Sequence, residues 1–429
     1  MDGSLSPIRL PFDTVRLAGR LFLPLAFFYT LGAVAHQGVM LAAVFLARPE
    51  GWHAYLGFGV LSLGLLITLA AYIAMLNTAG RALGDRRVEA RSPDERERGL
   101  LDAVAHTLLP FLVFYSAWNL FRKDLQEFQL LSNELHPQIN LESIDVLLNL
   151  FNVNVLLVVI TFLIFLVKVA CERLYAATGR RPFGVANSAF ECMWMFFGII
   201  SLGQWIGDAV EWLTSRVVWA DAMGLADRLP LVREVKQGLE VLSPYFPDIK
   251  DGLIMPLVWL AMAAIVYTSF VTDEAALLRG TRAEARVSGL WLRLPGPVRT
   301  AAEFFSRGFR DKYVPLANGL RLVLRGGGLF YLTFCLVYAA LEALASVAFI
   351  GLARLVGPHE ILWWQMWEGA VTFPVDLLHE VLRVSLLAVA FDLALRRGAG
   401  RAAARGPAPI APAAAPSTAT PAAPPAPAG

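Results

Sequence analysis

The stretch LFLPLAFFYTLGAVAHQGVMLAAVFLA, residues 21–47, indicates the class of this protein. It contains no Asp, Glu, Lys or Arg. A helix rises ~1.5 Å per residue, so about 20 apolar residues cross the ~30 Å hydrocarbon core of a bilayer. Three arginines precede the stretch and Ala33-Val34-Ala35 resembles a signal-peptidase site, but the apolar run continues well past it. We therefore expect an uncleaved first transmembrane helix.

The rest of the chain is also unusually apolar. Hydrophobic residues make up 57% of it and charged residues 17%, whereas soluble domains are about half apolar and a quarter charged. The mean hydropathy is +0.56. Lipid tolerates no unpaired backbone, and the apolar runs are too long for barrel strands, so the spans must be helices. We predict an all-α, polytopic integral membrane helical bundle (domain 21–396), with about eight transmembrane helices in four hairpins. The expected spans are 21–47, 54–80, 100–121, 146–170, 190–214, 253–272, 328–353 and 377–396.

The basic residues predict the orientation of these spans. Segments 1–20, 81–99, 171–189, 273–328 and 397–429 carry 25 Lys plus Arg, against 9 in the four segments between them. Cytoplasmic loops retain Lys and Arg, so both termini should lie in the cytoplasm. Abundant Arg, Ala and Pro are typical of GC-rich bacterial genomes. We therefore expect a multi-pass protein of a bacterial cytoplasmic (inner) membrane.

Three segments should lie outside the bilayer core. Residues 1–20 should form a cytoplasmic arm. Residues 397–429 should form an Ala/Pro-rich tail with almost no large apolar side chain, a composition that predicts disorder. Residues 273–327 form a basic cytoplasmic loop, in which aromatic residues recur every four positions around Arg307, Arg310 and Lys312. This pattern favours an amphipathic helix on anionic lipids, although a cytoplasmic partner remains an alternative.

Ionisable residues inside a span are costly and therefore mark candidate sites. Glu342 lies deep in span 328–353, on a helical stripe of small residues that predicts a close helix neighbour. Arg383, in span 377–396, lies at comparable depth and is the expected partner, with His379 and Glu380 one turn away. The group is either a structural ion pair or a proton- or ion-coupling site.

Two further polar groups are candidates. His36 and Gln37 of the first span, Asn152 of the fourth, and Gln204, Asp208 and Glu211 of the fifth are expected at similar depth near the outer face. They would line a water-filled outer cavity, unless these helices begin a turn later and the residues meet headgroups. In the third span, Pro110 cannot donate a hydrogen bond to the carbonyl of His106, which predicts a kink.

Motifs of catalysis are missing from the sequence. It has no Walker A sequence, nucleophile elbow, Cys-x-x-Cys pair or haem-attachment motif, so we assign no catalytic, cofactor or metal residues. The topology accounts for the basic residues, so nucleic acid is not an expected partner. A transporter- or channel-like protein is the favoured function. The alternatives are a structural or assembly subunit, with a membrane-protein partner or further copies of itself, and a membrane enzyme acting on lipid-linked substrates.

Overall fold

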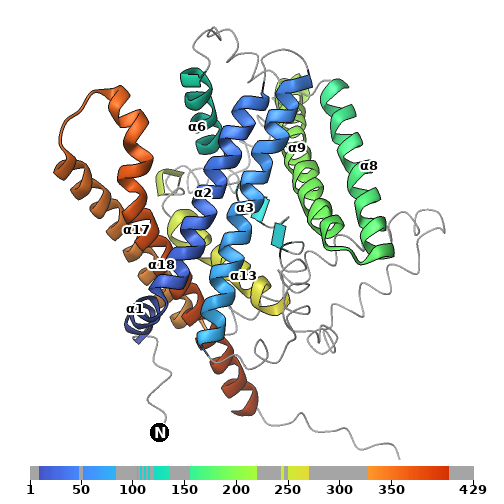
Figure 1. The fold of residues 1–429 in the computed structure, drawn as a ribbon. Coiled ribbons are helices and arrows are strands. Elements are labelled where there is room, and N and C mark those ends of the chain that lie inside the picture. Colours follow the sequence, from blue (N-terminus) through green and yellow to red (C-terminus); the bar gives the residue numbers. More distant parts are fainter. Residues whose placement is uncertain are drawn as a thin grey trace, which may run out of the picture.

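The computed structural model describes residues 9–47, 52–83, 120–135, 155–219, 243–245, 250–269 and 327–404, with isolated helical positions between 104 and 115. These residues are nearly all helical and contain no strand (Figure 1). The α-helices are α1 (Leu10–Arg20), α2 (Phe22–Leu46), α3 (Trp52–Ala82), α6 (Leu120–Leu135), α8 (Val155–Thr178), α9 (Arg181–Thr214), α13 (Met255–Ser269), α17 (Gly328–Val356) and α18 (Ile361–Ala404). A short 3-10 helix, Ser243–Tyr245, and a π-helix, Lys250–Ile254, precede α13.

Three stretches of the described chain are long and apolar enough to cross a membrane: Leu10–Leu46, Tyr55–Ala82 and Gly328–Val356. They coincide with three of the expected spans. Asp251–Tyr267 is apolar but shorter. An all-helical protein with candidate membrane-spanning helices is therefore confirmed for the described residues, whereas the number of eight spans stays a prediction.

The hairpin of α2 and α3 forms the centre of the molecule. Leu61, Leu65, Leu69 and Ile73, spaced by four residues along α3, are all buried, because one side of a helix repeats at that interval. The helices approach closely at Gly57, where an added Cβ would lie 2.4 Å from the Ala47 Cβ and 2.9 Å from its Cα. Glycine at this position therefore permits the approach.

Helices α13 and α18 pack against α3. Tyr267 of α13 stacks on Phe391 of α18 at 4.8 Å between ring centroids. Its hydroxyl donates a hydrogen bond of 3.0 Å to the Leu76 carbonyl of α3. Most residues between Val381 and Ala394 are buried, so this half of α18 belongs to the core.

Helices α8 and α9 form a second hairpin, which turns at Gly179 with φ of +61°. It packs on α3 through α9, where the Cys192 thiol donates to the Ser62 carbonyl. Large apolar side chains of α8, such as Phe162 and Leu163, are exposed and suit a lipid-facing surface.

Helix α17 and the first half of α18 form a third hairpin, which projects from the other helices (Figure 1). Large apolar side chains near its tip are exposed, among them Leu355 at 82% and Ile361 at 75%. At the tip, the His359 ring stacks on Trp363 with centroids 4.0 Å apart. Pro374 lies inside α18.

Several helix boundaries differ from those expected. The described part of α8 starts at Val155, and α9 begins at Arg181 rather than at 190. Helix α18 starts at Ile361 rather than at 377, and continues to Ala404, past the expected start of the tail. Expected spans four and five contact each other as the hairpin of α8 and α9, and the expected pairing of spans three and four stays a prediction. Most of span three lies outside the described residues, as do Arg307, Arg310, Lys312 and residues 405–429.

Candidate functional site

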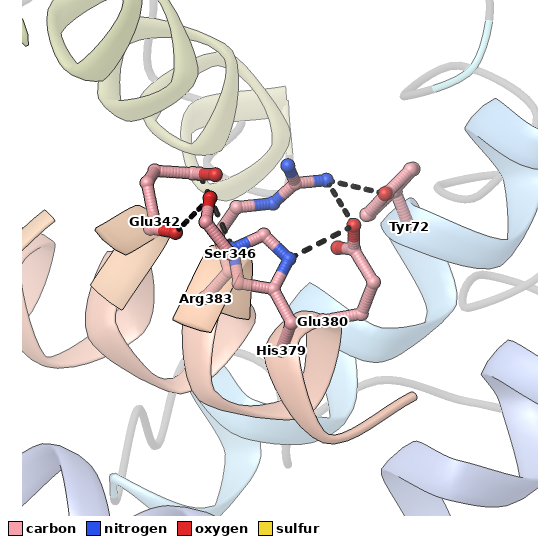
Figure 2. Close-up of polar contacts among 6 residues, drawn as sticks. All are labelled: Tyr72, Glu342, Ser346, His379, Glu380 and Arg383. Atoms are coloured by element: carbon pink, nitrogen blue, oxygen red, sulfur yellow. Dashed lines mark hydrogen bonds and ion pairs between the residues drawn. The ribbon is translucent and has the colours of Figure 1, made fainter. Parts of the chain in front are cut away.

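Glu342, His379, Glu380 and Arg383 form a polar cluster, which Tyr72 joins. The cluster lies where α18 enters the core, between α17 and α3 (Figure 2). Glu380 and Arg383 occupy adjacent turns of α18 and are buried, with exposed fractions of 9% and 7%. Their spacing places both side chains on one side of the helix. Glu342 reaches the cluster from α17 and Tyr72 from α3.

Arg383 is held by contacts with three helices. An Nη atom lies 2.6 Å from Glu380 Oε1 and also donates to the Tyr72 hydroxyl. The guanidinium lies over the Trp259 ring of α13, with Cζ 4.2 Å from the centroid. The planar guanidinium suits this combination of ion pair and aromatic stacking, which a Lys would not reproduce.

His379 lies between the two carboxylates. Its Nε2 is 3.2 Å from Glu342 Oε1, and its Nδ1 is 3.9 Å from Glu380 Oε1. The expected direct partner of Glu342, Arg383, instead pairs with Glu380. The sequence therefore identified the four residues of the cluster, but the structure inserts His379 between Glu342 and the Glu380–Arg383 pair. The reason is that Glu380 precedes Arg383 by three residues on the same helix and reaches it without crossing the hairpin.

Five buried polar atoms in this cluster lack a well-aligned hydrogen bond: Tyr338 Oη, Glu342 Oε1, His379 Nε2, Glu380 Oε2 and Arg383 Nε. Three of these atoms face one another, because Glu342 Oε1 lies 3.2 Å from His379 Nε2 and Tyr338 approaches the same carboxylate. Buried polar atoms are normally satisfied, by water or an ion where protein does not reach them. The cluster thus has the hydrogen-bonding capacity to hold water or a small ion.

The charges of the cluster nearly cancel. Two carboxylates and one guanidinium leave one negative charge when His379 is neutral, and none when it is protonated. Glu342 is the more exposed of the two hairpin partners, with 41% of its side chain exposed against 12% for His379.

Four of the six residues expected to line an outer cavity have described side chains. His36 lies against α3, with Nδ1 3.3 Å from Thr68 Oγ1. Gln37 instead donates to Glu127 of α6 at 2.6 Å. Asp208 and Glu211 are exposed on α9, which packs on α3 and α8.

Other predicted residues cannot be placed. Asn152, His106 and Pro110 lie outside the described residues, as does the side chain of Gln204. The outer cavity and the proline kink remain predictions. Within the described part of the chain, no three His, Cys, Asp or Glu side chains gather as metal ligands.

Sequence reasoning missed the aromatic members of the polar cluster. Tyr72, Trp259 and Tyr338 come from three different helices and stand among apolar residues, where tyrosine and tryptophan are ordinary core residues. No spacing rule links them to Arg383. A buried tyrosine or tryptophan does require a partner for its polar atom, and this requirement was the only available signal.

No known family model, curated protein or solved structure matches the chain.

Proposed function

We propose that this protein is a transporter- or channel-like protein of a bacterial inner membrane, and that the cluster of Glu342, His379, Glu380 and Arg383 is its intramembrane site. One observation carries the proposal: acidic and basic side chains from two apolar helices meet at a buried place where five polar atoms lack a well-aligned hydrogen bond. Such groups are costly inside a membrane protein and usually mark the path of an ion or proton.

The geometry favours protons or small cations as the transported species. His379 has a carboxylate near each ring nitrogen, so a proton on either nitrogen faces a negative group. Glu342 provides the accessible end and the Glu380–Arg383 pair the buried end. Proton transfer along this series needs only small displacements of side chains or water.

The proposed topology has both termini in the cytoplasm. The arrangement in Figure 1 supports it, because α1, the end of α3, the turn between α8 and α9 and the end of α18 lie toward one end of the bundle. The last turn of α2, the first turn of α3 and the connection from α17 to α18 lie toward the opposite end. The first group carries the arginine-rich segments that should face the cytoplasm.

Flux through proteoliposomes tests this proposal. Purified protein is reconstituted with an internal pH-sensitive dye, and a membrane potential is imposed in the presence or absence of sodium. Replacing Glu342 with Gln removes the accessible charge and should abolish flux while leaving the yield of monodisperse protein unchanged. The matched control is Glu368→Gln, an exposed carboxylate on the same hairpin.

The outcomes are distinct. Flux by the wild type and the Glu368 variant, but not by the Glu342 variant, supports an intramembrane coupling site. Aggregation of the Glu342 variant, or equal flux by all three proteins, contradicts that role.

A second candidate function is a subunit of a larger membrane complex. The projecting hairpin of α17 and α18 favours this function, because only 11% of the most apolar 18-residue part of α17 is buried inside the structure. Purification from native membranes in mild detergent, followed by mass spectrometry of intact complexes, tests this alternative. A stoichiometric partner lost on replacing Leu336 and Leu344 with Ser would favour a subunit, whereas a chain isolated alone would favour an autonomous transporter. Both residues are exposed on α17.

A further inference from the structure

The short helix α1 has three distinct sides. Leu10, Thr14, Leu17 and Ala18 face the protein and are buried, where α1 packs on α17 and α18. The opposite side carries Phe12 and Val15, which are 68% and 62% exposed. Because an α-helix turns ~100° per residue, the positions 9, 16 and 20 fall on a third, separate strip. This strip consists of Arg9, Arg16 and Arg20, all exposed.

The position of α1 matches a helix that lies in the plane of a membrane surface. In Figure 1 it is seen nearly end-on at the foot of α2, so it runs across the direction of the long helices. The helix breaks at Leu21, whose φ of −109° and ψ of 15° separate α1 from α2. In-plane helices typically combine an apolar side with a Lys- or Arg-rich side.

The exposed apolar surface continues from α1 into α2. Leu23, Phe27 and Val34, on the first turns and the middle of α2, are exposed by 79%, 61% and 66%. This surface belongs to α2, the longer part of the apolar stretch Leu10–Leu46 and the part that matches the expected first span. Phe12 and Val15 therefore lie near the level at which that span would leave the hydrocarbon.

The arginine strip is available for a ligand. None of the three arginines forms an ion pair with any residue that the structure describes, although Asp13 is on the same helix. Guanidinium groups bind phosphate in a bidentate manner, and each basic residue near an anionic membrane contributes about fivefold to association.

We propose that Arg9, Arg16 and Arg20 bind the phosphate headgroups of anionic phospholipids, with Phe12 and Val15 inserted beside them. Because α1 packs on both α17 and α18, bound lipid would stabilise the base of the helices that carry the polar cluster. The inference requires a membrane-embedded protein but does not depend on transport.

Lipid titration of the full-length protein tests the proposal. The chain is purified in a neutral detergent, stripped of lipid, and titrated with either phosphatidylglycerol or phosphatidylcholine while intact-mass spectrometry counts the bound lipids. The test variant carries Arg9→Gln, Arg16→Gln and Arg20→Gln. The matched control carries Arg173→Gln, Arg180→Gln and Arg181→Gln, three exposed arginines around the turn between α8 and α9, toward the same end of the molecule.

We expect the wild type and the control to prefer phosphatidylglycerol, and the test variant to lose about tenfold or more in affinity for it. Binding of phosphatidylcholine should be equal in all three proteins. Equal losses in both variants would overturn the proposal, because they would show a general effect of positive charge. Unchanged affinity of the test variant for phosphatidylglycerol would also overturn the proposal. So would a co-purifying protein that the wild type binds and the test variant does not, if lipid binding is the same in both.

Amide exchange gives a second readout. In nanodiscs containing phosphatidylglycerol, α1 of the wild type and the control should exchange more slowly than in phosphatidylcholine nanodiscs. The test variant should show no such difference between the two lipids. Slowing in the test variant as well would contradict a role for the three arginines.

Discussion

Replacing Arg383 with Leu should destabilise the protein strongly, because it leaves the carboxylate of Glu380 without its cation. Glu380 is only 9% exposed and its ion pair with Arg383 is 2.6 Å long. Breaking one side of a buried pair costs about 3–5 kcal/mol. Loss of the guanidinium over Trp259, at 4.2 Å, adds about 0.5–2 kcal/mol that is not strictly additive. We therefore expect a total loss of at least about 3 kcal/mol.

Two companion variants make this prediction sharp. Arg396→Leu removes an arginine of the same helix whose partner is Asp392 at 2.9 Å, but Arg396 is 58% exposed. Its loss should cost less than about 1 kcal/mol. The double variant Glu380→Leu with Arg383→Leu removes both charges and should recover most of the loss. About 1 kcal/mol should remain, because the partly buried Tyr72 hydroxyl loses the guanidinium as its partner.

Unfolding in mixed micelles of neutral detergent and sodium dodecyl sulfate, followed by circular dichroism, measures these differences. The reasoning is refuted if Arg383→Leu costs no more than Arg396→Leu. It is also refuted if the double variant is no more stable than Arg383→Leu alone, since an uncompensated Glu380 would then not be the cause.

Two further changes test the packing of the bundle, in the same unfolding assay. Gly57→Ala should destabilise by about 1–3 kcal/mol because its Cβ would collide with Ala47, whereas Gly38→Ala, with nothing within 4 Å, should be neutral or stabilise by up to about 1 kcal/mol. Equal effects would refute the close approach of α2 and α3. Tyr267→Phe keeps the stacked ring but removes the hydrogen bond to the carbonyl of Leu76, and should cost about 1 kcal/mol. No loss on this change would show that the hydroxyl does not join α13 to α3.

The outer cavity predicted from the sequence has a separate test, because Asp208 and Glu211 lie exposed on α9. With Cys171, Cys192 and Cys335 replaced by Ser, single cysteines at 208 and 211 are treated with a membrane-impermeant thiol reagent on intact cells. Labelling at both positions is expected, since exposed carboxylates should meet water. Absence of labelling at either position would contradict both the predicted cavity and the predicted outward orientation of this end of α9.

The sequence alone determined the helical class and the position of the longest apolar helices. Uncharged runs leave few alternatives, so α2, α3 and α17 begin and end close to the expected residues. The predicted helix boundaries were wrong where polar residues interrupt an apolar helix. Helix α18 includes Glu368, Pro374 and Asp376 before it enters the core. Because of these residues, the hydropathy pattern predicted a loop before residue 377. A helix continues through such residues when one of its sides can pack against a neighbour, and packing is not visible in hydropathy.

The tertiary structure decided which side chains meet. The sequence identified Glu342, His379, Glu380 and Arg383 as unusual, because ionisable residues in apolar helices are costly wherever they lie. It did not determine their pairing, since a difference of one turn along α18 decides whether Glu380 or Glu342 reaches Arg383. Tyr72 and Trp259 join the cluster only because α3 and α13 pack on the same half of α18. The free-energy cost of burying an ionisable side chain depends on that residue and its own helix, so the sequence reveals it. Ion pairs and aromatic contacts depend on the relative placement of several helices.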